Sequence, residues 1–118
     1  MHRLALAALI LAATPALAVT PAMPEDEIFA ARYGCEGDTP LEAVFINTAS
    51  GNSFAVVALE GRAIPMAVAM SASGARYLSE PDVDGVQYEL WTKGNEATLS
   101  TIKDGVDAPL LAGCASAE

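Results

Sequence analysis

Short runs of apolar residues separated by turn sequences are the main pattern of the chain from residue 28 onward. In the run 41–48 the side chains alternate between two faces with a period of two. One face carries Leu41, Ala43 and Phe45, and the other carries Glu42, Val44 and Ile46. This pattern is typical of a strand with one face in a core. Turn sequences rich in Gly, Asp, Asn or Pro recur at roughly the 8 to 12 residue spacing of an all-β domain. We therefore expect strands over residues 28–35, 41–48, 53–59, 62–70, 75–79, 86–92, 96–103 and 110–114.

Consecutive short strands with no segment of helical period predict an antiparallel meander. A small eight-stranded barrel is the expected fold, because closure removes exposed edges and eight strands enclose a space that side chains fill. A two-sheet sandwich is the alternative that the pattern leaves open. Pro65 would place part of 62–70 at an edge or a bulge. Six alanines would suit a narrow interior: Ala43, Ala55, Ala58, Ala67, Ala69 and Ala97.

The first 18 residues have the features of a secretory signal peptide. Arg3 precedes an apolar run over 4–13, and Ala16-Leu17-Ala18 provides a small-residue cleavage site after Ala18. The run is shorter than the roughly 20 apolar residues of a spanning helix. No cysteine follows the cleavage site to carry a lipid anchor, so we expect a soluble periplasmic or secreted protein. Residues 19–27 would be a flexible leader and 28–118 one domain.

The two cysteines, Cys35 and Cys114, are expected to form a disulfide in an oxidising compartment. This link closes a loop of 79 residues, and the chain-entropy account gives it about 4 to 5 kcal/mol. No Cys-x-x-Cys motif supports a redox or metal site. The only histidine is His2, inside the signal peptide. We therefore expect no metal and no cofactor.

The charge of the chain is strongly acidic, with 15 Asp and Glu against 6 Lys and Arg. Removal of residues 1–18 takes away Arg3 and leaves a net charge of −10. Such a field repels nucleic acid and anionic membranes and speeds encounter with a cationic partner. Solubility alone would also account for it.

Two blocks stand out as candidates for a functional site. The first is Ser71-Ala72-Ser73-Gly74-Ala75-Arg76-Tyr77, in which Gly74 permits a close backbone approach. The second is Trp91-Thr92-Lys93-Gly94-Asn95-Glu96-Ala97, which puts Lys93 at a tight turn after an aromatic strand. Taken alone, Ser71, Ser73 and Lys93 would be ordinary turn residues.

Together with the cysteines, these blocks resemble the bacterial membrane-bound and periplasmic inhibitors of C-type lysozyme, over the domain from Tyr33 to Cys114. The resemblance implies an eight-stranded barrel that plugs the cleft of a lysozyme with two loops. It places on Ser73 and Lys93 the role of reaching the enzyme's catalytic carboxylates. It also implies a stoichiometric inhibitor rather than an enzyme.

Several neighbouring residues have two interpretations. Gly74, Arg76 and Tyr77 are candidate lysozyme-binding residues beside Ser73 and Lys93. Tyr77, Tyr88 and Trp91 would also suit packing within the barrel. Arg76 would either pair with Glu96 or face the partner.

The segment between Leu78 and Val86 is longer and more acidic than the resemblance leads us to expect. It adds Glu80, Asp82 and Asp84, which we expect beside the contact site. These acids would engage arginines on a cationic lysozyme, or the added length would obstruct its cleft.

Two other functions remain as alternatives. Ser73 would be a nucleophile with Lys93 as its base in an enzyme, but such a lysine must be desolvated and a Lys-Gly-Asn turn is exposed. A small-molecule or lipid-binding barrel would use its interior instead of its loops. The sequence does not specify the oligomeric state.

Overall fold

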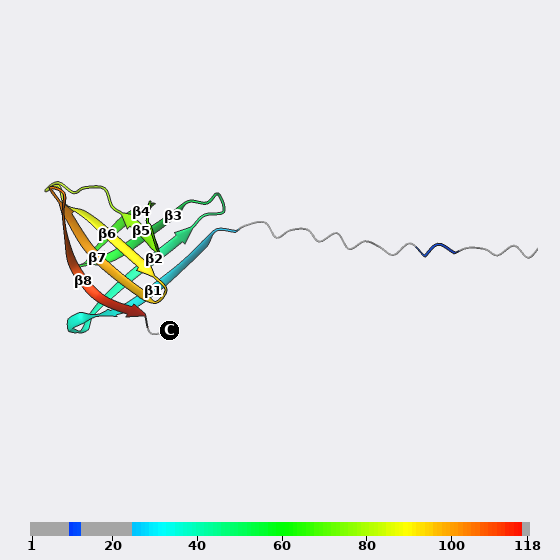
Figure 1. Cartoon of the computed structure of the whole chain (residues 1–118), viewed down its shortest axis with the longest axis horizontal. Helices are drawn as coiled ribbons and strands as arrows, with labels where there is room; N and C mark the ends of the chain where they lie inside the picture. Colours follow the sequence, from blue (N-terminus) through cyan, green and yellow to red (C-terminus); the bar gives the residue numbers. More distant parts are fainter. Residues whose placement is uncertain (1–9, 13–24, 117–118) are drawn as a thin grey trace, which may run out of the picture.

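The computed structural model describes residues 10–12 and 25–116, and residues 27–116 form a closed barrel of eight antiparallel strands (Figure 1). The all-β barrel prediction is confirmed, and the sandwich alternative is not. In chain order the strands are β1 (Glu27–Cys35), β2 (Thr39–Asn47), β3 (Ser53–Leu59), β4 (Arg62–Ala69), β5 (Ala75–Leu78), β6 (Gln87–Lys93), β7 (Glu96–Lys103) and β8 (Val106–Ser116). A short 3-10 turn, η1 (Glu36–Asp38), joins β1 to β2.

The described residues leave out most of the predicted signal peptide and leader. Residues 1–9 and 13–24 lie outside them, and β1 begins at Glu27. Within the described part of the chain, no helix has the length and apolar character needed to cross a bilayer.

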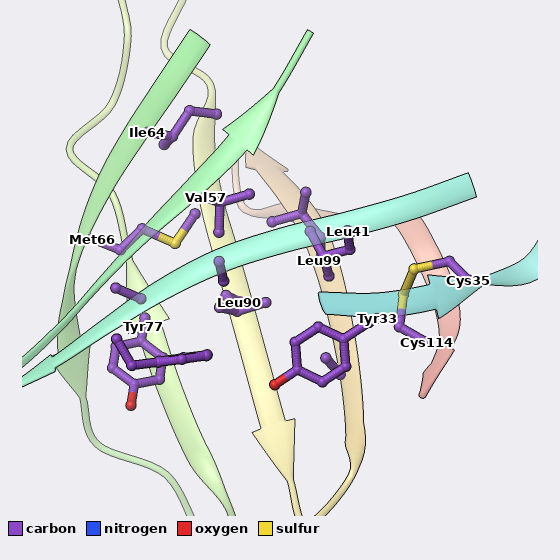
Figure 2. Packing of buried hydrophobic residues seen from close by; sticks show 14 residues of the cluster. Tyr33, Cys35, Leu41, Val57, Ile64, Met66, Tyr77, Leu90, Leu99 and Cys114 are labelled. Carbon is purple, nitrogen blue, oxygen red and sulfur yellow. A yellow bond between two sulfur atoms is a disulfide. The ribbon is translucent and has the colours of Figure 1, made fainter. Parts of the chain in front are cut away.

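Alternation along each strand sends one row of side chains into the barrel. In β2 this row is Leu41, Ala43 and Phe45, all buried, while Glu42 and Val44 between them are exposed. The interior is filled by apolar side chains from all eight strands, several of which are labelled in Figure 2. Four of them are completely buried: Leu41, Val57, Leu90 and Leu99.

The barrel closes at a short seam between β1 and β8. Up to Ser116, the last residue that the structure describes, two residue pairs form this ladder: Tyr33 with Ser116 and Gly34 with Ala115. The disulfide between Cys35 and Cys114 lies directly beside these pairs and confirms the predicted link (Figure 2). A covalent bond therefore supports the place where the hydrogen-bonded ladder is shortest.

Two prolines lie in strands where their missing N–H group affects the pairing. Pro65 lies in a part of β4 that pairs with β3 but that β5 does not reach, because the β4–β5 ladder covers only Ala67–Ala69. This agrees with the edge position expected for Pro65. β8 begins at Val106, four residues earlier than predicted. The strand can include Pro109 because this proline lies where bulges interrupt the ladder with β7, so its missing N–H is tolerated.

The six alanines are divided between the two faces of the wall. Ala43, Ala55 and Ala97 are buried inside the barrel, as expected. Ala58 and Ala67 are exposed and Ala69 is half-buried, so the expected interior position is wrong for the first two. They fall on the opposite phase of the alternation from their neighbours Val57 and Met66.

The connections of a meander fall alternately at its two ends (Figure 1). Here the connections at the two ends differ in charge. One end, which we call the acidic end, carries η1 and the connections 60–61, 79–86 and 104–105. These connections hold seven carboxylates: Glu36, Asp38, Glu60, Glu80, Asp82, Asp84 and Asp104. The other end, which we call the loop end, carries connections 48–52, 70–74 and 94–95, and none of their residues is charged.

Candidate functional site

The two sequence blocks meet at the loop end of the barrel. Because Ala75 of β5 pairs with Thr92 of β6, the loop 70–74 lies against the turn that follows Lys93. Gly74 makes the contact, with φ +69°. A Cβ at Gly74 would collide with the Thr92 carbonyl oxygen and would lie 3.2 Å from the Lys93 Cβ. Only glycine therefore permits this approach.

The backbone of Ser73 is held by two side chains that converge on its carbonyl oxygen. Ser71 Oγ donates to this oxygen at 2.7 Å, and the indole Nε1 of Trp91 donates to it at 3.0 Å. Leu90 next to Trp91 is buried inside the barrel, so Trp91 lies on the outer face of β6. Trp91 is thus a positioning residue for the loop rather than interior packing. A tryptophan N–H usually has a hydrogen-bond partner, and this was the signal that sequence reasoning missed.

Ser73 and Lys93 present their side chains to solvent at this end of the barrel. Within residues 25–116, no hydrogen bond or ion pair of the protein occupies the Ser73 hydroxyl or the Lys93 ammonium. One ammonium with three donors and one hydroxyl are therefore available together to an acidic partner group. The fixed Ser73 backbone reduces the conformational freedom that binding must remove.

Arg76 is engaged by the protein itself. Its Nε lies 2.6 Å from Glu89 Oε2, and both side chains are largely covered. The expected pairing with Glu96 is wrong, because Glu96 stands opposite Lys93 at the turn instead. Arg76 and Trp91 are cross-strand partners, so the ion pair lies beside the tryptophan on the outer face.

Tyr77 lies inside the barrel, where only 6% of it is exposed. Its ring is 5.6 Å from the ring of Phe45, and burial raises the pKa of its hydroxyl. The sequence allows two roles for Tyr77, packing within the barrel and contact with the partner. The structure places it in the packing position.

The acidic segment 79–86 lies at the opposite end of the β5–β6 hairpin from Ser73 and Lys93. The expectation that Glu80, Asp82 and Asp84 lie beside the contact loops is wrong. Consecutive connections of a meander alternate between ends, so the segment between the two blocks in sequence is distant from both in space. Asp82 orders this segment, because its Oδ1 accepts the backbone N–H groups of Asp84 and Val86, each at 2.9 Å.

The barrel interior does not favour the alternative of a small-molecule or lipid site, because buried side chains fill it. An open groove of about 470 Å³ lies instead on the wall formed by β1 to β4, lined by Ala30, Val44, Val56, Ala58 and Ala63 among others. A serine-lysine nucleophile is also disfavoured, because Lys93 is exposed rather than desolvated.

A filled barrel that holds two exposed loops together at one end has the architecture of a binding protein rather than of an enzyme with an interior active site. Residues 33–107 match the family described as membrane-bound lysozyme-inhibitor of c-type lysozyme. The chain belongs to this family, whose members are inhibitors and not enzymes.

Two relatives illustrate the family. A membrane-bound lysozyme inhibitor of C-type lysozyme from Cupriavidus necator is 37% identical over 89 residues, which cover 75% of this chain and 66% of the relative. The match thus spans slightly less than two thirds of that relative's length. The crystal structure of a periplasmic lysozyme inhibitor of C-type lysozyme from Salmonella typhimurium superposes with a TM-score of 0.66 at 35% identity. That match covers 78% of this chain and all of the other.

Proposed function

We propose that the protein inhibits a C-type lysozyme by inserting its 70–74 loop and its Lys93 turn into the enzyme's active-site cleft. The observation that carries the proposal is the contact of Gly74 with Thr92 and Lys93, which makes one surface of two loops 20 residues apart in sequence. Family membership supplies the class of target.

The chemistry of the two side chains suits the active site of a glycosidase. Such an enzyme uses two carboxyl groups, one of which must be protonated to act as a general acid. The Lys93 ammonium beside that group would lower the carboxyl pKa and remove the protonated form. The Ser73 hydroxyl would add a hydrogen bond, and the loops would occupy the space of the sugar.

The compartment follows from the same proposal. We expect export by the signal peptide, cleavage after Ala18, and a soluble protein in the periplasm or outside the cell. The disulfide supports an oxidising compartment. One relative is called periplasmic and the other membrane-bound.

The test is a titration of the lytic rate of a C-type lysozyme on bacterial cell walls with the protein and its variants. Lys93→Ala is expected to weaken inhibition at least about 30-fold and Ser73→Ala about 5- to 30-fold, because each removes a contact in a water-excluded cleft. Lys103→Ala is the matched control. Lys103 is also exposed and also the last strand residue before a tight turn, but that turn is at the acidic end.

The outcomes separate the function from the mechanism. Stoichiometric inhibition that is lost in the Lys93 variant and kept in the Lys103 variant supports both. Inhibition that all three variants retain keeps the function and rejects the loop mechanism. No inhibition at micromolar protein rejects the function.

A further inference from the structure

The interior row of β4 continues past the closed part of the barrel. Ile64 and Met66 are buried, but Val68, which pairs with the inward-facing Tyr77, is 46% exposed. Met70, two residues further and just beyond the end of β4, is 93% exposed. Apolar side chains that begin as core thus end in solvent at the loop end.

The interior row of β1 behaves in the same way at the same end. Tyr33 is buried and Phe29 is 49% exposed. The Phe29 ring lies 5.4 Å from Phe45, whose ring in turn lies 5.6 Å from Tyr77, the cross-strand partner of Val68. Phe29 and Val68 therefore flank one aromatic cluster. We call Phe29, Val68 and Met70 the apolar mouth.

The apolar mouth adjoins the proposed contact loops. Met70 directly precedes Ser71, which holds the Ser73 carbonyl. The loop itself offers only small side chains after Met70: Ser71, Ala72, Ser73 and Gly74. Small polar residues exclude little water, yet a hydrogen bond or an ion pair is strong only where water is excluded.

We infer that the apolar mouth is the water-excluding part of the lysozyme-binding surface and that Met70 is its principal contact. This inference rests on the proposed function. It adds Met70 as the side chain that excludes water around the polar contacts of Ser73 and Lys93. A sugar-binding cleft offers apolar and aromatic faces to its ligand. A flexible thioether adapts to such faces and makes favourable contacts with aromatic rings.

The exposure of Met70 is informative because of where Met70 lies in the barrel. Single exposed apolar residues are common on protein surfaces, and Val83 at the acidic end is one, with an exposure of 102%. Met70 differs from Val83 because it follows Ile64, Met66 and Val68 at the same two-residue spacing and directly precedes a fixed loop. The two residues therefore form a matched pair for an experiment.

The experiment measures inhibition of a C-type lysozyme by the whole protein and by Met70→Ala, Met70→Gln, Met70→Leu and Val83→Ala. Met70→Ala and Met70→Gln are expected to weaken inhibition about 10-fold, while Met70→Leu and Val83→Ala stay within about 2-fold of the unsubstituted protein. Because Met70 is almost fully exposed, its substitution leaves folding intact, and urea midpoints check this.

Three results would overturn the inference. Equal inhibition by Met70→Ala and Val83→Ala rejects the mouth but leaves the Ser73 and Lys93 mechanism in place. A dimer in light scattering that Met70→Ala dissociates, with no change in inhibition, assigns the mouth to a second copy of the chain. Absence of inhibition by the unsubstituted protein rejects the proposed function and the mouth together.

Discussion

The connections at the two ends of the barrel differ in charge and in what fixes them. At the acidic end, seven carboxylates lie on four connections, and Asp82 organises the longest of these by accepting backbone N–H groups. At the loop end the connections are uncharged, and the 70–74 loop is fixed by Gly74, Ser71 and Trp91. Under the proposed function, the loop end supplies recognition at short range, while the net charge of the whole protein supplies attraction at long range.

Under the proposed function this division matters, because the expected partner is a basic C-type lysozyme. A net charge of −10 after loss of residues 1–18 raises the rate of encounter from all directions. The carboxylates at the acidic end lie away from Lys93, and within residues 25–116 the cross-strand Glu96 forms no ion pair with it either. We expect charge to set the association rate and the loops to set the dissociation rate.

The largest effect is expected from opening the seam between β1 and β8, which holds both ends in one barrel. Replacement of Cys35 and Cys114 together by serine is expected to lower the free energy of unfolding by about 4 to 5 kcal/mol, because a 79-residue loop is no longer closed in the unfolded chain. Urea unfolding with and without reductant measures the loss. A double variant within about 1 kcal/mol of the oxidised protein would contradict it.

A sharper comparison replaces one glycine at each end. Gly74 and Gly85 have nearly the same φ, +69° and +75°, but of the two a Cβ collides only at Gly74. Gly85→Ala is expected to cost about 1 to 2 kcal/mol for the left-handed backbone. Gly74→Ala is expected to cost about 1 to 3 kcal/mol more because it forces the two loops apart.

Inhibition distinguishes the two glycine variants further. Gly74→Ala is expected to weaken inhibition at least about 10-fold, because it displaces Ser73 relative to Lys93. Gly85→Ala leaves inhibition unchanged at temperatures where both variants are folded. Equal inhibition by both would mean that the two loops do not act as one surface.

A smaller effect is expected from the charge of the acidic end. The triple variant Glu80→Gln, Asp82→Asn and Asp84→Asn keeps the oxygen acceptor at position 82 and removes three charges. Its association rate constant with a basic lysozyme should fall about 2- to 10-fold at low salt, with an unchanged dissociation rate. The difference should vanish at about 1 M salt. A faster dissociation would show instead that this end touches the enzyme.

The smallest effect is expected from the tyrosines inside the barrel. Burial raises the pKa of Tyr77, and burial together with the nearby Tyr77 raises that of Tyr33, both above the usual 10.0. The folded state therefore holds these protons more tightly than the unfolded chain. The resulting stability is fully present below pH 10 and is lost as pH rises through the folded pKa values. Tyr77→Phe should reduce the decline of the urea midpoint between pH 9 and 11.

The order of the strands could be predicted from sequence because alternation and turn residues are local signals. The bounds of β3 and β7 agree with the prediction to the residue. β8 was predicted too short, because Pro109 and the bulges around it depend on pairing with β7 that no local pattern reveals. The disulfide was predictable because two cysteines allow one pairing.

The candidate site was predictable in composition but not in arrangement. Ser73 and Lys93 were found from their blocks, whereas the ion pair of Arg76 with Glu89 depends on the register of β5 against β6. The position of the acidic segment 79–86 follows from which end each connection reaches. Proximity in sequence was misleading here, because a meander separates neighbouring connections by the length of a strand.

The hydrogen bond from Trp91 to the Ser73 carbonyl also gives the molecule its own spectroscopic reporter. The chain contains one tryptophan, and its indole N–H donates to the backbone of the loop that is proposed to bind the lysozyme. Protein made with fluorotryptophan would therefore give one fluorine resonance, free of background from an unlabelled partner. The chemical shift and line width of this resonance would report binding of a lysozyme at the loop.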